Sequence, residues 1–91
     1  MIKGQLILHD QEVSDNNYNF NVNKYMTQGF SHAFGDEAFF ILMAAIELIK
    51  KTYPDSADYL QTFSYVTPNY TTDFWIINDE THVTALLPSE Y

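Results

Sequence analysis

The chain has 91 residues, of which 46% are hydrophobic and 16% aromatic, so it predicts one small folded domain, residues 1–91, rather than a disordered segment. Twelve acidic residues stand against four lysines, there is no arginine, and the formal net charge is -8, which disfavours direct binding of nucleic acid because phosphate contacts need clustered lysine or arginine. The absence of cysteine excludes disulfides and thiolate chemistry.

Residues 2–9 form the first predicted strand, because Ile2, Leu6 and Leu8 fall on one face of an extended chain. The same N-terminal region lacks the cationic head and continuous apolar stretch of a signal peptide, so we expect a cytoplasmic protein. Residues 10–16 are polar and predict a turn. The simplest connection is a hairpin between the first strand and the next.

Residues 17–23 alternate without a fault between apolar side chains and asparagine, which predicts a second strand. Three apolar side chains should face the core: Tyr18, Phe20 and Val22. The four asparagines form either a solvated outer face or a ladder of amide groups used in recognition. Residues 24–30 can continue this strand, with Gly29 as a bulge or as the turn that leads into the following helix.

Residues 38–49 are the stretch around which the chain is organised, since eleven of the twelve are apolar and only Glu47 interrupts them. Acidic residues before this stretch and lysines after it are placed favourably for the dipole of a helix. Ser31 or Asp36 could cap this helix, and Pro54 would end it. At roughly 1.5 Å per residue, such a helix is too short to span a hydrocarbon layer of about 30 Å. We therefore expect a core helix and no membrane contact.

Three further strands are predicted after the helix, over residues 57–66, 72–78 and 81–87. The first two should form a hairpin, because residues 67–70 carry a turn signal between them. The order β-β-α-β-β-β predicts the α+β class. The expected architecture is an antiparallel sheet of four to five strands, with the single apolar helix packed on one face.

Two short segments on either side of the helix, Tyr25-Met-Thr-Gln-Gly29 and Asp58-Tyr-Leu-Gln-Thr-Phe63, resemble a known pattern. Together with the apolar helix they are similar to the Y-x-T-x-G … D-Y-L-Q-x-F segments of a family of small uncharacterised proteins from Gram-positive bacteria and their phages. The resemblance covers roughly residues 24–87. This chain departs from it at Gln28, where a basic residue is usual, and in the added N-terminal hairpin. The resemblance implies no activity; it implies a compact α+β accessory protein of a phage or another mobile element, in a bacterial host cell.

No residue pattern in the chain names a reaction. His9, His32 and His82 are far apart and show no local spacing typical of metal ligands. There is no serine elbow and no glycine-rich phosphate loop. We therefore expect no catalytic residue, no metal and no cofactor, and a small metal-dependent enzyme is the least favoured hypothesis.

The second half of the chain predicts a docking surface, because its acidic residues have no lysine or arginine among them after Lys51. Tyrosine and tryptophan beside carboxylates are typical of protein-binding surfaces. The candidate residues are Asp55, Asp58, Tyr65, Tyr70, Asp73, Trp75, Asp79 and Glu80. The expected partner is a basic protein, such as a nuclease whose nucleic-acid groove is blocked as by an anti-CRISPR or another DNA mimic. In the alternative interpretation, acidity serves solubility alone.

The helix predicts a second surface, since one sheet can cover only one side of a helix that is apolar nearly all round. Unless the N-terminal hairpin covers it, the other side should pack against a second copy or another protein. The candidate residues are Phe39, Phe40, Met43 and Ile46. A structural homodimer joined through this side is therefore the main alternative to an inhibitor.

Overall fold

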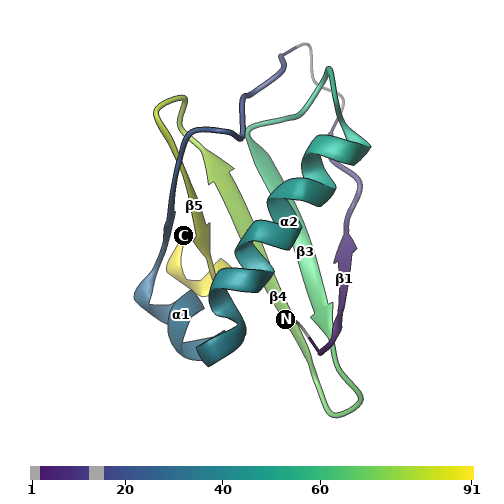
Figure 1. The fold of residues 1–91 in the computed structure, drawn as a ribbon, viewed down its shortest axis with the longest axis vertical. Helices are drawn as coiled ribbons and strands as arrows, with labels where there is room; N and C mark the ends of the chain where they lie inside the picture. Colours follow the sequence, from purple (N-terminus) through teal and green to yellow (C-terminus); the bar gives the residue numbers. More distant parts are fainter. Residues whose placement is uncertain (1–2, 13–15) are drawn as a thin grey trace.

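The computed structural model describes residues 3–12 and 16–91, so the predictions that fall on Ile2 and on residues 13–15 lie outside the described residues. The described elements are β1 (Gln5–Leu8), β2 (Asn23–Met26), α1 (Gln28–Phe34), the 3-10 turn η1 (Gly35–Glu37), α2 (Ala38–Thr52), β3 (Leu60–Val66), β4 (Thr71–Asn78), β5 (His82–Leu86) and the 3-10 turn η2 (Pro88–Glu90). Figure 1 shows α2 lying diagonally across a five-stranded sheet. The predicted α+β class, with the helix on one face of the sheet, is confirmed.

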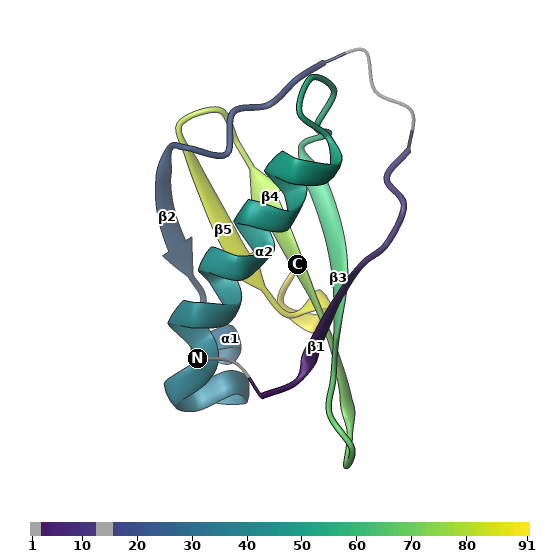
Figure 2. The same ribbon diagram turned by 45° about the vertical axis from the view of Figure 1, so that its right-hand side comes forward.

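The sheet has the strand order β1-β3-β4-β5-β2, so the predicted N-terminal hairpin is wrong. β1 pairs antiparallel with β3, whereas β2 pairs parallel with β5 at the opposite edge of the sheet. The sheet is therefore mixed, although its other pairings are antiparallel as predicted. From β2, the chain crosses the sheet through α1 and α2 before β3 begins, as Figure 2 shows from the side.

Residues 17–22 lie outside the regular strands, because β2 begins only at Asn23. Their predicted alternation nevertheless holds: Phe20 is buried, and Tyr18 and Val22 pack against the core. Polar side chains fix this segment in place of a strand ladder. The Asn78 amide donates to the Asn19 carbonyl at 2.7 Å, Lys50 donates to the Asn21 side chain at 3.0 Å, and the Ala57 N–H donates to the Asn17 side chain at 3.2 Å.

A short helix that was not predicted, α1, precedes α2 and is capped by Thr27. Neither Ser31 nor Asp36 caps α2, because its N-cap residue is Glu37 and no side chain bonds to the cap. The Thr27 hydroxyl accepts the N–H of Phe30 at 3.1 Å, which is the usual role of an N-cap residue. Gly29 therefore lies inside a helix and not at a bulge. A Cβ at this position would lie 2.5 Å from the Glu90 carboxylate, so only glycine fits there without a shift.

Glu90 joins the C-terminal turn to the start of α1. Its carboxylate accepts the Thr27 hydroxyl at 2.6 Å, the Gly29 N–H at 3.1 Å and the Leu87 N–H at 2.8 Å. These donors, the Thr27 hydroxyl first, lower the pKa of Glu90 below its ordinary value. The two ends of the chain segment from residue 27 to residue 90 are thus held together by one ionised side chain.

α2 supplies one whole layer of the core. Its buried side chains, which face the sheet, are Ala38, Ile41, Leu42, Ala45, Ile46 and Ile49. Ile46 is only 1% exposed, so the prediction that it belongs to an outer helix surface is wrong. Phe39 and Phe40 remain exposed and Met43 is half-buried, because one sheet covers only one side of the helix.

Tyr65 connects β1, β3 and the start of α2 from inside the core. Its side chain is fully buried, and its hydroxyl accepts the N–H groups of Lys3 and Gly4 at 3.1 and 2.7 Å. The same hydroxyl donates to the carboxylate of Glu37. Burial, and then the hydrogen bond to Glu37, raise the pKa of Tyr65, so it is a neutral phenol at physiological pH.

We expect Tyr65→Phe to lower the free energy of unfolding by about 1–2 kcal/mol, because it leaves the Glu37 carboxylate and two N–H groups without their buried partner. Urea unfolding followed by circular dichroism measures the change. Tyr70→Phe is the matched control, since Tyr70 is 52% exposed, and it should unfold like the natural protein. Equal stability of the two variants would contradict this role for the Tyr65 hydroxyl.

We expect the stability lost in Glu90→Gln to depend on pH. Because the folded state lowers the pKa of Glu90, the ionised carboxylate stabilises the fold fully above the ordinary glutamate range and loses this effect as the pH falls through the lowered pKa. The difference in unfolding free energy between the natural protein and Glu90→Gln should therefore be largest at neutral pH and shrink in acid. Thr27→Ala removes the donor that lowers the pKa of Glu90 most, so the stability of this variant should depend less on pH than that of the natural protein. A stability difference between the natural protein and Glu90→Gln that stays constant with pH would rule out this linkage.

Candidate functional site

The directions of the strands bring three loops to one end of the molecule. β1 and β4 end where β3 and β5 begin, because each neighbouring pair among them is antiparallel. The segments after β1, between α2 and β3, and between β4 and β5 therefore meet at the end of the sheet drawn at the top of Figure 1.

Among the residues that the structure describes, six acidic residues lie in these three loops. We name this surface the acidic end and define it by Asp10, Glu12, Asp55, Asp58, Asp79 and Glu80. All six are exposed except Asp58, which is half-buried. None of the four lysines lies in the loops that carry them, although Lys50 and Lys51 occupy the last turn of α2, just before Asp55. The acidic end is therefore a cluster of carboxylates built from distant parts of the sequence.

A hollow of about 290 Å³ opens between two of these loops. It is lined by Asp10, Gln11, Glu12, Asp58, Tyr59, Leu60 and Thr62. Three carboxylates thus border one depression, and Tyr59, which is 43% exposed, lies beside them. This arrangement can accept a cationic side chain of another protein.

Gln11 holds the two walls of this hollow together. Its side-chain oxygen accepts the Asp58 N–H at 2.8 Å and the amide of the buried Gln61 at 2.6 Å. Its own amide donates to the Ser56 carbonyl at 2.7 Å. The side chain of one residue therefore fixes the segment after β1 against the segment before β3, so the acidic residues on both are brought together by the folded structure.

The turn between β4 and β5 presents two further carboxylates, while Asp55 lies exposed in the segment between α2 and β3. One Asp79 oxygen accepts the N–H groups of His82 and Thr81 at 2.9 and 3.0 Å, and also the Thr81 hydroxyl at 2.9 Å. The backbone bond from His82 is the main reason why the pKa of Asp79 is lowered, so this carboxylate stays charged in mild acid. Glu80 adopts a φ of 82°, the left-handed conformation of a tight turn, and its side chain is exposed.

The predicted docking residues do not form one surface. Asp55, Asp58, Asp79 and Glu80 lie at the acidic end as defined above. Tyr65 is fully buried in the core and cannot contact a partner, so that prediction is wrong. Tyr70 precedes β4 at the opposite end of the sheet from the acidic end.

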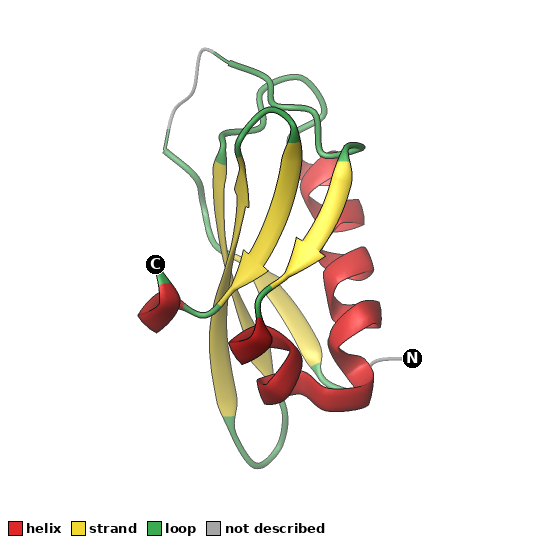
Figure 3. Ribbon diagram, turned by 90° about the vertical axis from the view of Figure 1, so that its left-hand side faces the viewer, coloured by secondary structure: helices red, strands yellow, loops and turns green. Residues whose placement is uncertain are grey.

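Trp75 and Asp73 lie on the face of the sheet away from α2. Trp75 is opposite Thr62 and Leu86 in the neighbouring strands, and its ring centroid lies 5.4 Å from that of Tyr91. Asp73 accepts the Ser64 hydroxyl at 2.7 Å. Figure 3 shows the sheet nearly edge-on, with the C-terminal turn on the side away from the long helix. Trp75 is half-buried, and no acidic-end residue adjoins it in the strand register.

Asp10 and Glu12 are the site residues that the sequence analysis did not select. They reach the acidic end only because β1 pairs with β3, about sixty residues later in the chain, as in the pair Leu6 and Tyr65. The alternating apolar residues of β1 indicated a strand but not its neighbour. A search for complementary apolar faces on the first and third strands could have suggested this pairing.

Metal binding finds no support in the part of the chain that the structure describes. There, no group of three or more histidine, cysteine, aspartate or glutamate side chains could hold a metal ion. His9 contacts the Thr62 and Ser64 hydroxyls, and His82 lies 3.1 Å from an Asp79 oxygen. Among residues 3–12 and 16–91, moreover, no helix combines the length and apolar character needed to cross a bilayer.

No protein-family model, curated protein or solved structure matches this chain. The resemblance stated from the sequence therefore stays a prediction. The structure does give part of its pattern a physical role, because Thr27 caps α1 and Gly29 makes room for Glu90.

Proposed function

We propose that this protein is a non-enzymatic inhibitor that places its acidic end in the basic groove of a nucleic-acid-handling enzyme. The observation that supports the proposal is the gathering of six carboxylates from three loops at one end of the sheet, with no lysine in those loops. Grooves that bind nucleic acid are lined with lysine and arginine, which contact phosphates. A surface with the same sign of charge as the phosphates competes for those side chains.

The acidic end also has a hollow in which a side chain of the partner can bind. The carboxylates of Asp10, Glu12 and Asp58 border it, so a lysine or arginine side chain of the partner can enter and pair with them. The exposed ring of Tyr59 offers a contact for the cation or for its apolar stem. Charge would then set partner choice and association rate, while this pocket sets orientation.

A phage or mobile-element origin fits both the charge and the resemblance of the sequence. In that setting, the blocked enzyme is a bacterial defence nuclease, and the protein acts as an anti-CRISPR or another DNA mimic. Inhibition would be steric and electrostatic, so it needs neither a cofactor nor a catalytic residue in this chain.

We expect Glu12→Gln/Asp55→Asn to weaken binding to the partner by on the order of 2- to 30-fold, since each exposed ion pair contributes roughly 0.2–1 kcal/mol. Binding of the natural protein should also weaken between about 0.1 and 1 M salt, as the screening length falls from about 10 to 3 Å. The partner is captured with the natural protein from a lysate of a Gram-positive bacterium. Salt and competing double-stranded DNA should each release the partner from the protein.

The matched control is Glu47→Gln/Asp73→Asn, which removes the same two charges from exposed positions outside the acidic end. It should retain the partner as the natural protein does. Equal loss in both variants would show that only the overall charge matters. Binding that resists salt and DNA would contradict the proposal and leave solubility as the role of the acidic residues.

A further inference from the structure

The outer side of α2 carries an exposed aromatic pair near its start. Phe39 is 59% exposed and Phe40 is 48% exposed, although both belong to the helix that supplies the core. Their ring centroids lie 5.7 Å apart with the rings nearly perpendicular, and Met43 follows one turn later, half-buried. Two neighbouring phenylalanines in water are unfavourable unless another surface covers them.

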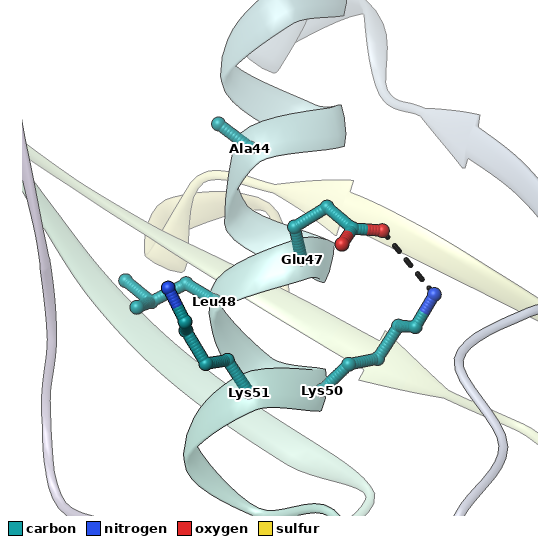
Figure 4. Close-up of a pocket in the computed structure, with 5 residues that line it drawn as sticks. All are labelled: Ala44, Glu47, Leu48, Lys50 and Lys51. Atoms are coloured by element: carbon teal, nitrogen blue, oxygen red, sulfur yellow. Dashed lines mark hydrogen bonds and ion pairs between the residues drawn. The ribbon is translucent and has the colours of Figure 1, made fainter.

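A hollow lies farther along the outer side of the same helix. It has a volume of about 610 Å³ and is lined by Ala44, Glu47, Leu48, Lys50 and Lys51. Figure 4 shows Glu47 and Lys50 joined by an ion pair of 3.2 Å on one side of the helix, with Leu48 and Lys51 on the other. The small side chain of Ala44 and the apolar stems of its neighbours give the hollow an apolar floor with a charged rim.

The aromatic pair and the hollow can meet across a two-fold axis that passes midway between them. Their centres are separated by about eight residues, or roughly 12 Å along a helix. The midpoint lies near Met43 and Ala44. If a second helix runs antiparallel across this midpoint, the phenylalanines of each copy meet the hollow of the other, and the contact is made twice.

We propose that the outer side of α2 is a homodimer interface in which Phe40 of each copy enters the hollow around Leu48 of the other. Ala44 lies at the crossing point, where a small side chain lets two helices approach closely. The antiparallel arrangement also opposes the two helix dipoles favourably. The proposal does not depend on the function of the acidic end.

Charge selects a second copy of this chain as the occupant. Two of the four lysines, Lys50 and Lys51, lie on this side of α2, where Asp36 and Glu47 are the exposed acids, so the face is neutral in a protein of net charge -8. Antiparallel pairing places Asp36 of one copy opposite Lys51 of the other. This face therefore adds little to the repulsion between two acidic molecules, and the acidic ends of the two copies point in opposite directions.

The test is disulfide cross-linking of single-cysteine variants, which is specific because the natural chain has no cysteine. Ala44→Cys places one thiol near the proposed axis, so mild oxidation at low micromolar concentration should convert most of the protein into a covalent dimer. Thr71→Cys places a thiol at an exposed position on β4. This matched control should form little covalent dimer. Equal cross-linking of the two variants would overturn the proposal.

The mass in solution gives an independent readout. Analytical ultracentrifugation of the natural protein should show twice the monomer mass, and Phe40→Glu should shift the dissociation constant by at least tenfold. Because Phe40 is exposed, this variant should keep its circular dichroism spectrum, as should the control Tyr70→Glu, which should remain dimeric. A natural protein that stays monomeric to millimolar concentration, or a dimer unchanged by Phe40→Glu, would overturn the interface.

Discussion

The pairing of β1 with β3 is the constraint on which the described surface depends. It places Leu6 and Leu8 opposite Tyr65 and Phe63 under α2, so the N-terminal strand is held by the apolar core as well as by its backbone. The Tyr65 hydroxyl then binds the chain just before β1. Without this pairing, the acidic segment after β1 would have no fixed position, and the hollow at the acidic end would lose one wall.

The helix and the last three strands could be predicted because residues that are close in the sequence determine them. The apolar stretch of α2 and the turn between β3 and β4 are encoded by neighbouring residues. The position of β2 was missed because it depends on a parallel contact with β5, which lies more than fifty residues later in the chain. The start of α1 was missed because Thr27 receives its support from Glu90, sixty-three residues away.

The same distinction separates the predicted site from the observed surface. Charge is a property of the sequence, so Asp55, Asp58, Asp79 and Glu80 could be selected as candidate docking residues before any fold was known. Burial is a property of the whole fold, and alternation on a central strand does not say which tyrosine faces inward. Tyr65 was therefore assigned to the surface, although the helix covers its side of the sheet.

The distribution of charge gives the acidic end and the α2 face different physical characters. At the acidic end, carboxylates gather in loops that contain no lysine, and bringing them together opposes folding through repulsion, which Gln11 and Asp79 offset with hydrogen bonds. Solubility alone would be served equally well by carboxylates spread over the surface. The α2 face balances two acids with two lysines beside exposed phenylalanine. One fold thus offers a charged surface suited to an unlike partner and a neutral one suited to its own copy.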